Sequence, residues 1–500
     1  YMMQYIVDQK LDCEICMRTD NDVYEIRINT DRGKVIMRDS YAIWNSPLEK
    51  LATSFCPEIP KLKIDIENFD PHNPEHIEYA KRDVQILLIG LPRLFAMLGE
   101  HFGVSPNATF ASTSLKGWQK TLPKEKIYDA SKFDEKEIFV RQAYYGGLVF
   151  LTNTRKQSNC RTYDLNSSYP ASMMEFGVPY GRAAESTDYV DGKMGIYHCR
   201  VKAPDDLIVP IIPARDKRGA MRWYRGEFDT VCTNRELVFA AKHGYEIIDI
   251  YSGLVYESVE FPFNDYIQHC RDIRNKYKGG PEEILAKFMQ NSLYGKFGSR
   301  RERRRIIAAH TLSESELIGL IPYDDSGNWY VEKEIDDEMR CKPEWAVFIT
   351  AHSRLRLLRA VYSIGPENVY YGDTDSITIR AGSEGNLNIG DEYGQWKLEK
   401  EWKEFRAIAP KVYSGILQDG TRKGAAKGLP RKNLTPDHWR ELLDDGATSA
   451  QALSLASLRV TLKSGVKPAQ MLLRHSSELS KSANFDALSN GDVRVKMASS

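Results

Sequence analysis

The chain has 500 residues, of which 42% are hydrophobic, and its 69 basic side chains balance its 69 acidic ones. This size and hydrophobic content predict a globular protein with more than one domain. The neutral balance neither favours nor excludes nucleic acid as a partner, while the lack of an 18-residue apolar run and of a secretory signal argues against a membrane or exported protein.

The eight cysteines are scattered, and the single CxxC pair, Cys13 and Cys16, has no second pair to complete a zinc site. We therefore expect reduced thiols and a cytoplasmic location. Three local basic clusters occur, at 271–280, 299–305 and 421–432. Each is interpreted either as a solvated face or as a contact for nucleic-acid phosphate.

The first hundred residues indicate alternating strands and helices. Strands are predicted over 23–29 and 34–40, around the turn TDRG. A helix is predicted to begin at Asn73, a good N-cap, with Pro74 at its first position. Tyr79 and Asp83 lie four residues apart and therefore share a face of this helix.

The middle of the chain predicts a strand, a polar turn and a helix over 161–177, RTYDLNSSYPASMMEFG, with the strand ending at Asp164 and the helix opening near Tyr169. A β-rich stretch follows to about 262. Two helices then meet at KYKGGP, and the spacing along them places several polar side chains on shared faces: Arg271, Arg274 and Lys278 on the first, and Lys287, Asn291 and Tyr294 on the second.

Further on, the pattern predicts a hairpin around 324–328, a helix over 344–365 and a second hairpin over 368–381, NVYYGDTDSITIRA. Beyond the KVYSG segment, the last ~85 residues are predicted to be mostly helical.

The second hairpin places Asp373 and Asp375 one residue apart, where their charges repel. One interpretation is a surface turn, and the chain has other acidic dyads of this kind, at 12/14 and 65/67. The other is a site for divalent metal. Asp164, at the end of a predicted strand, supports the metal site, because two Mg²⁺ ions that catalyse phosphoryl transfer need carboxylate oxygens. The helix that opens near Tyr169 could direct backbone N–H groups at a phosphate, or could be a capped surface helix.

These segments resemble the family B DNA polymerases, most closely the protein-primed type of bacteriophages and linear plasmids. DLNSSYP is similar to the family's DxxSLYP motif, with Ser168 in place of leucine, and KFMQNSLYG and YGDTDS are similar to the second and third motifs, in the expected order. AYYGGLVF is similar to the YxGG motif, and KVYSG to the KxY motif. The resemblance covers nearly the whole chain and fades after about 435.

The resemblance implies an α+β fold: a right-hand polymerase of palm, fingers and thumb, with a partial RNase H-like 3′–5′ exonuclease domain at the N-terminus. The implied segments are the partial exonuclease domain (1–108), first part of the palm (109–180), an insertion where a terminal protein docks (181–262), fingers (263–297), a strand-displacement hairpin insertion (298–343), second part of the palm (344–415), and thumb with C-terminal region (416–500).

It also implies a role for each matched residue. Asp164 and Asp375 would hold two Mg²⁺ ions, for which Mn²⁺ can substitute, and Asp373 would support them as a third catalytic carboxylate. Residues implied to bind the nucleotide are Leu165, Tyr169, Arg274, Lys287, Asn291 and Tyr294. Residues implied to bind DNA are Tyr144, Gly146, Gly147, Lys411, Tyr413 and Lys427. The implied partners of this monomer are primer–template DNA, dNTPs and a terminal protein primer, in the cytoplasm of a host cell.

Tyr79 and Asp83 resemble the last motif of the family's proofreading nuclease. Asp12 and Glu14 lie too near them to be its first motif, so we expect a chain truncated through its exonuclease domain and without proofreading. Two other functions stay open: a non-catalytic nucleic-acid-binding remnant, which the truncation favours, and a reverse transcriptase, which shares a similar aspartate hairpin. Intact Asp164 and Asp375 argue against the first, and NSLYG with DLNSSYP against the second.

Overall fold

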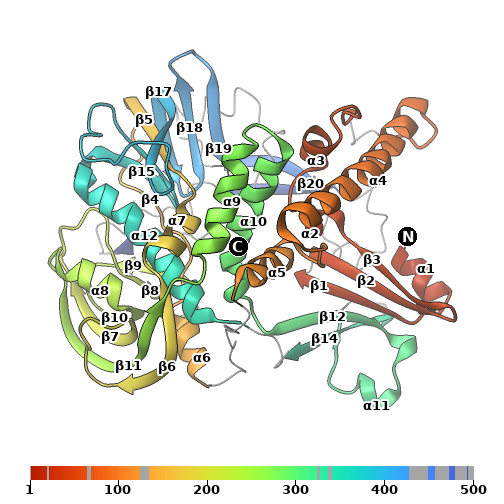
Figure 1. The fold of residues 1–500 in the computed structure, drawn as a ribbon, viewed down its shortest axis with the longest axis horizontal. Coiled ribbons are helices and arrows are strands. Elements are labelled where there is room, and N and C mark those ends of the chain that lie inside the picture. Colours follow the sequence, from red (N-terminus) through yellow and green to blue (C-terminus); the bar gives the residue numbers. More distant parts are fainter. Residues whose placement is uncertain are drawn as a thin grey trace. The chain divides into compact units, whose positions relative to one another are not determined.

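The structure is a computed structural model that describes residues 2–19, 22–64, 69–123, 135–323, 327–335, 341–426, 449–455, 472–478 and 492–493 (Figure 1). The chain divides into two compact units, each built from separate stretches of sequence. The first comprises Tyr1–Lys132, Asp265–Cys341 and Leu455–Leu473. The second comprises Phe133–Asn264, Lys342–Ser454 and Arg474–Ser500.

A six-stranded sheet in the order β13-β14-β12-β1-β2-β3 organises the first unit. Its strands are β1 (Cys13–Thr19), β2 (Asp22–Thr30), β3 (Gly33–Arg38), β12 (Glu302–Ala308), β13 (Ile321–Pro322) and β14 (Trp329–Ile335). All of its pairings are antiparallel, and β1 joins β12 with Glu14 opposite Ile307. The sheet therefore unites strands from two segments that the sequence analysis treats separately, 1–108 and 298–343.

Helices complete the first unit: α1 (Met2–Asp8), α2 (Ser40–Trp44), α3 (Leu48–Phe55), α4 (Pro74–Phe102), α5 (Phe110–Thr121), α9 (Asn264–Lys276), α10 (Pro281–Phe297) and α11 (Glu314–Leu317). Helices α5 and α10 pack closely where Gly117 faces Met289, since a Cβ at Gly117 would lie 2.9 Å from the methionine Cε. The buried ring of Trp44 contacts Phe55, Phe110 and Phe288 edge-on. These contacts fix the helix that carries Lys287, Asn291 and Tyr294.

Helix α4 begins as predicted, with the Asn73 side chain accepting a hydrogen bond from Glu75 N and Pro74 in the first turn. Among the described residues it is also the one helix that is long and apolar enough to cross a membrane, although it contains no uninterrupted run of 18 apolar residues. A single helix of this kind is weak evidence for a membrane span. It packs on α3, where Gly90 touches Leu51 and Cys56.

The second unit is organised by a seven-stranded sheet in the order β19-β18-β17-β5-β16-β15-β4. These strands are β4 (Val149–Leu151), β5 (Gln157–Leu165), β15 (Val369–Asp373), β16 (Ser376–Arg380), β17 (Trp396–Ala409), β18 (Val412–Leu417) and β19 (Arg422–Ala426). The accompanying helices are α6 (Glu135–Gln142), α7 (Ser168–Glu175) and the long, largely buried α12 (Pro343–Ile364).

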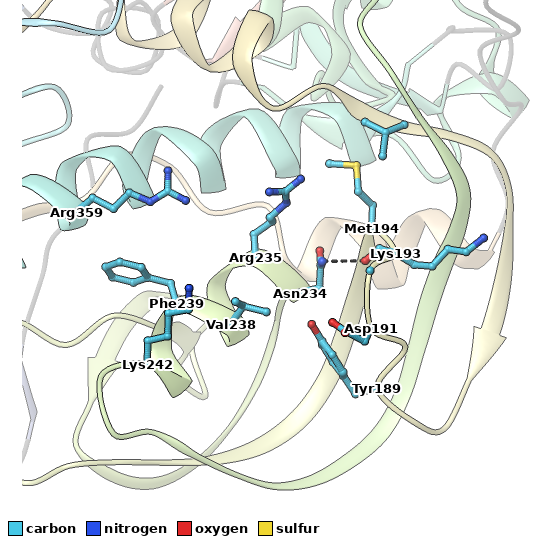
Figure 2. A pocket seen from close by; sticks show the side chains of 12 residues that line it. Tyr189, Asp191, Lys193, Met194, Asn234, Arg235, Val238, Phe239, Lys242 and Arg359 are labelled. Carbon is cyan, nitrogen blue, oxygen red and sulfur yellow. Dashed lines mark hydrogen bonds between the residues drawn. The ribbon is translucent and has the colours of Figure 1, made fainter.

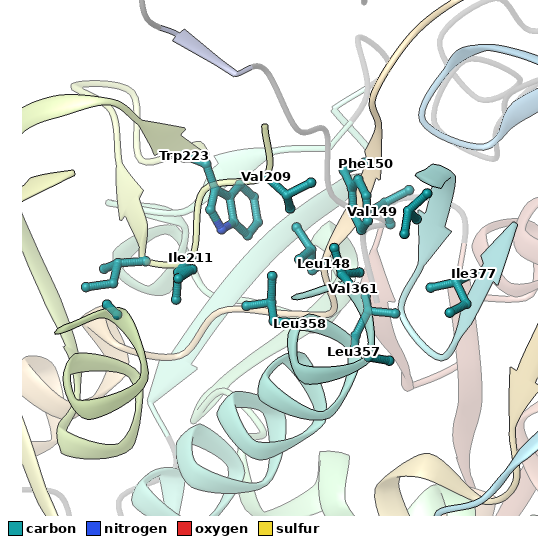
Figure 3. Packing of buried hydrophobic residues seen from close by; sticks show 14 of the residues in the cluster. Leu148, Val149, Phe150, Val209, Ile211, Trp223, Leu357, Leu358, Val361 and Ile377 are labelled. Atoms are coloured by element: carbon teal, nitrogen blue, oxygen red, sulfur yellow. The ribbon is translucent and has the colours of Figure 1, made fainter. Parts of the chain in front are cut away.

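A second sheet, in the order β10-β7-β11-β6, forms most of the 181–262 segment. It consists of β6 (Val178–Ser186), β7 (Gly195–Ala203), β10 (Gly226–Thr233) and β11 (Glu246–Glu260), with α8 (Asn234–Ala241) and the short strands β8 (Pro213–Arg215) and β9 (Met221–Tyr224) alongside. Figure 3 shows Leu357, Leu358 and Val361 of α12 packed between the seven-stranded sheet and the 181–262 segment. One continuous core thus links the two sheets of the second unit.

The elements predicted over 23–302 and 344–381 are confirmed, including the strand that ends beside Asp164 and the paired helices α9 and α10. Strands β13 and β14 of the hairpin predicted around 324–328 pair with each other, and residues 324–326 of its turn lie outside the described residues. The prediction of a mostly helical C-terminal region is wrong for the described residues. There the chain forms strands at 422–426, 449–455, 472–478 and 492–493. The alanine- and leucine-rich pattern favours a helix, but strand pairing overrides that weak preference.

Candidate active site

Asp164, Ser376 and Asp373 form one row across three adjacent strands. Ser376 of β16 lies opposite Asp164 of β5, and Asp373 of β15 lies opposite Ser376. Neighbouring strands are ~4.8 Å apart, so these side chains project from the same face of the sheet at close range. Asp375 sits in the turn of the same hairpin, and its carbonyl accepts a hydrogen bond of 2.7 Å from Leu165 N. The fold therefore gathers the three aspartates that the motifs single out.

In the absence of a bound cation, the negative charges of the three aspartates repel one another. Burial raises the pKa of the Asp375 carboxyl from its ordinary value of 3.8, and the nearby charges of Asp164 and then Asp373 raise it further, to about 7. A carboxyl held in this way gains free energy when a cation arrives, because the cation replaces like-charge repulsion with attraction.

The turn of the hairpin packs against the loop at 143–148, which contains Gly146 and Gly147. Thr374 adopts a left-handed conformation with φ of 59°, and its N–H donates to Leu148 O at 2.7 Å. A Cβ added to Gly147 would lie only 2.6 Å from Thr374 Oγ1. Glycine at 147 is therefore needed for this approach, which explains one glycine of the YYGG segment.

Lys411 lies on the aspartate row. Its Nζ is 2.8 and 3.0 Å from the two carboxylate oxygens of Asp373. Its backbone N–H donates to the hydroxyl of Tyr371 at 2.9 Å, and its φ of 61° turns the chain between β17 and β18. Tyr413, the second residue expected to bind DNA here, packs its ring 5.5 Å from that of Tyr371. The KxY segment and the third motif are thus one local structure.

Two arginines that the sequence analysis missed fasten the loop at 143–148. Arg354 of α12 donates to the carbonyls of Tyr145 and Gly146 at 2.8 and 2.9 Å, and to Glu236 Oε1 at 2.7 Å. The Arg354 and Glu236 side chains are only 1% and 2% exposed. Arg215 adds a 2.7 Å bond to the carbonyl of Tyr144. No sequence signal joins partners so far apart along the chain.

The turn after Asp164 leads directly into α7. Ser167, with φ of 51°, makes the turn, and its carbonyl accepts from Ala171 N. Ser168, which replaces the family's leucine, is buried and hydrogen-bonds through its Oγ to Ser353 Oγ of α12 at 3.0 Å. The departure from the motif is therefore matched by a polar partner. Leu165 is buried and Tyr169 is half-buried.

The residues expected on the fingers lie in the other compact unit. On α10, Lys287 is exposed, whereas Asn291 and Tyr294 are half-buried, and Arg274 lies on α9. Their approach to the aspartate row stays a prediction. Lys427, also expected to bind DNA, lies outside the described residues.

Tyr79 and Asp83, the pair that resembles a nuclease motif, both form hydrogen bonds with a lysine. Lys61 Nζ lies 2.5 and 2.6 Å from the two oxygens of Asp83 and 3.0 Å from the hydroxyl of Tyr79. The two side chains do share a helix face, as predicted. The charge of Asp83 is balanced within the chain.

The arginines of the 299–305 cluster that the structure describes are largely paired. Arg304 bonds Glu302 at 2.8 Å, and Arg305 contacts Glu14 at 3.1 Å and Glu332 at 2.6 Å. Glu14, a member of the acidic dyad at 12/14, therefore serves as an ion-pair partner within the sheet.

In the part of the chain that the structure describes, no group of three or more His, Cys, Asp or Glu side chains is close enough to hold a metal by itself. All eight cysteines are reduced and buried. The aspartate row can therefore supply part of a coordination shell, which suits Mg²⁺, an ion that retains water and takes substrate phosphate oxygens as ligands.

Comparison with known proteins gives consistent results. Residues 71–320 match the family described as DNA polymerase type B, organellar and viral. A probable DNA polymerase of Neurospora intermedia is 27% identical over 61% of the chain but only 35% of its own length, and the DNA polymerase of Streptococcus phage Cp-1 is 26% identical over 87% of the chain and 78% of its own length. The structure of phi29 DNA polymerase with primer–template DNA and incoming nucleotide superposes with a TM-score of 0.71 at 22% identity, over 93% of this chain and 84% of that one.

Proposed function

Because the chain belongs to the organellar and viral type B DNA polymerases, we propose that it performs the family reaction, template-directed addition of dNMP to a primer 3′-OH with release of pyrophosphate, at the row formed by Asp164, Asp373 and Asp375. The observation that carries this assignment is the raised pKa of Asp375 beside two further aspartates on adjacent strands. Paired carboxylates at such a cost in repulsion are typical of metal-dependent phosphoryl transfer.

The donor set fits Mg²⁺ or Mn²⁺, since it consists of hard carboxylate oxygens on a rigid sheet. Asp164 and Asp375 would hold the ions. When bound, the divalent metal supplies positive charge for the phosphoryl group and lowers the pKa of the attacking hydroxyl. Asp373 is ion-paired with Lys411 and orients the hairpin, and the positive charge of Lys411 offsets part of the repulsion at Asp375.

The chain's other residues bind and orient the substrates. Backbone N–H groups at the start of α7 face a phosphate held near Asp164, and Tyr169 forms the wall beside the sugar. Lys287 and Asn291 engage the triphosphate, with Arg274 adding charge, and Tyr294 lies against the nascent base pair. The loop at 143–148, with Tyr144, Gly146 and Gly147, guides the DNA strand, and Lys411 and Tyr413 hold the primer end.

We also propose that priming uses the hydroxyl of a terminal protein, which would dock on the 181–262 segment. The resemblance of the motifs to protein-primed enzymes and the match to the phage Cp-1 polymerase support this.

The reaction is tested by offering each dNTP singly with four templates that differ in the next base, a labelled primer and Mg²⁺. We expect extension by the complementary nucleotide alone. Extension that ignores the template base, or that needs an RNA template, would contradict the proposal. The second result would favour the reverse-transcriptase alternative.

Replacing Tyr169 with valine is expected to relax discrimination between dNTPs and rNTPs by about 10- to 100-fold, because removing bulk beside the sugar frees space for a 2′-OH. The ratio of kcat/KM for dCTP and CTP on one template measures this. Tyr180→Val, at an exposed tyrosine of β6, is the matched control and should leave the ratio unchanged. An unchanged ratio in Tyr169→Val would remove Tyr169 from the sugar pocket.

Replacing Lys411 with methionine is expected to lower kcat by about 10-fold or more and to move the acidic limb of the pH–rate profile upward. The positive charge of Lys411 lowers the pKa of Asp375. Without the lysine, the Asp375 carboxyl would therefore lose its proton only at a higher pH. Rates from pH 6 to 9 at saturating DNA measure the change. A pure loss of DNA affinity with an unchanged profile would mean that Lys411 acts only on the primer.

A further inference from the structure

A pocket of about 530 Å³ lies in the second unit (Figure 2). It is lined by the 189–194 turn, by one side of α8, by Val259 of β11 and by Arg359 of α12. No motif in the sequence points to it, and none of the residues assigned to the polymerase reaction lines it. Its volume is within the range of small-molecule sites.

The pocket is strongly basic. Arg235 and Arg359 reach it from two different helices, and Lys242 adds a third positive charge, against the carboxylate of Asp191. The Lys193 side chain extends away from the arginines and donates to Glu257 O at 3.2 Å. Within the described chain, neither guanidinium forms a hydrogen bond or an ion pair, and each instead lies over the ring of Phe176, at 5.9 and 5.2 Å. The side chains are available to a ligand, since Arg235 is half-buried and Arg359 is exposed to solvent.

The two arginines also repel each other. Partial removal from water lowers the pKa of Arg359, and the charge of Arg235 lowers it further. A third arginine on the same ring, Arg356, differs because it is ion-paired with Glu175. The cluster therefore holds two cations close together, neither with an ion-pair partner among the described residues, an arrangement that an anion between them would stabilise.

The walls of the pocket are pre-formed. The side chain of Asn234 donates to Lys193 O at 2.8 Å and accepts from Gly195 N at 3.3 Å, which ties the turn to the start of α8. Tyr189 and Phe239 supply aromatic surface beside the cations. A ligand would thus meet positive side chains next to an apolar wall, on a backbone that is already ordered, which lowers the ordering cost of binding.

We propose that this pocket is a phosphate-binding site, in which Arg235 and Arg359 clasp a phosphate group while the aromatic wall accepts the sugar or base attached to it. Phosphate fits better than a lone carboxylate, because it offers several oxygens and up to two negative charges to two guanidinium forks. The phosphate can come from a free nucleotide or from a nucleic-acid strand. The inference does not depend on the polymerase reaction.

The test is titration of the whole chain, in EDTA, with two probes: dAMP by calorimetry, and a fluorescent 12-nucleotide DNA strand by anisotropy. EDTA prevents metal-mediated binding at the aspartate row. The test variant is Arg235→Gln/Arg359→Gln. The matched control is Lys217→Gln/Arg218→Gln, which removes two exposed charges from the turn between β8 and β9 in the same segment. A second variant, Lys242→Glu, adds a negative charge at an exposed position of the lining.

We expect the double variant to bind dAMP about tenfold or more weakly than the wild type, because each charge-assisted hydrogen bond contributes substantially to affinity. Lys242→Glu should weaken binding as well, and the control should not. Loss confined to the DNA strand would support the site and identify a nucleic-acid phosphate as its ligand. Equal affinities of wild type and both variants for both probes would overturn the proposal and leave the cluster for acidic side chains of a protein partner. Thermal unfolding of the double variant should occur no lower than that of the wild type, since the repulsion is relieved.

Discussion

Replacing Asp375 with asparagine is expected to abolish primer extension and, at the same time, to stabilise the metal-free protein. Extension should fall by about 1,000-fold or more, because asparagine lacks the charge needed to hold a divalent ion. Stability should rise because asparagine removes the repulsion from Asp164 and Asp373 that raises the pKa of this carboxyl to about 7. A structural surface aspartate would show neither effect.

The direction of the stability change follows from proton binding. The folded state binds the Asp375 proton more tightly than the unfolded chain does, so this residue lowers stability as the pH rises from about 4 through 7. The gain from asparagine should therefore be small at pH 4 and full at pH 8. Its upper limit is on the order of 4 kcal/mol, since each tenfold change in proton affinity is worth ~1.4 kcal/mol.

Denaturant unfolding in EDTA at pH 4 and pH 8, together with single-turnover extension, measures both effects. Asp205→Asn is the matched control, because Asp205 is exposed and belongs to the same unit. An Asp375→Asn protein that extends primers normally, or that is less stable at pH 8 than the wild type, would contradict this prediction. Either result would show that the aspartate row is not a metal site whose charge repulsion lowers the stability of the metal-free protein.

Replacing Arg354 with methionine is expected to cost about 3–5 kcal/mol of unfolding free energy, the typical penalty for breaking a buried ion pair. The substitution leaves Glu236 charged and buried, and it leaves the carbonyls of Tyr145 and Gly146 without their donor. Because Gly147 of the same loop lies against Thr374, the hairpin that carries Asp375 should also lose its support.

A double-mutant cycle with Glu236→Gln separates the parts of this effect. We expect Arg354→Met/Glu236→Gln to be more stable than Arg354→Met alone, since the unpaired charge is gone. Lys397→Met is the matched surface control: it breaks an exposed pair with Asp391 and should cost less than ~1 kcal/mol. If Arg354→Met were as mild as this control, the loop at 143–148 would not depend on the arginine.

Much of the site could be predicted from sequence because its parts are local. The strand to Asp164, the left-handed turn at Ser167 and α7 are consecutive, and the hairpin around Asp373 and Asp375 is a single element whose residue pattern is distinctive. Alternation and helix caps fix such elements with neighbours only a few residues away.

The remaining parts of the site depend on contacts between residues far apart in the sequence, which local residue patterns do not encode. The Arg354–Glu236 pair joins residues 118 positions apart, and Lys411 reaches Asp373 across 38 positions. Ser168 departs from the family motif, and the motif alone does not indicate its hydroxyl partner, Ser353 on a distant helix. The pocket around Arg235 and Arg359 left no trace in the sequence, because its residues come from separate elements brought together by the core.

The most direct test of the central claim is single-nucleotide extension of a labelled DNA primer in Mg²⁺ by the wild-type chain and by Asp164→Asn, at DNA concentrations that saturate both. The wild type should add the one complementary nucleotide, and Asp164→Asn should bind the primer–template equally well and add none. Extension by Asp164→Asn at the wild-type rate would place the chemistry elsewhere in the chain. Absence of extension by a wild-type chain that is folded and bound to DNA would contradict the claim and leave a nucleic-acid-binding protein.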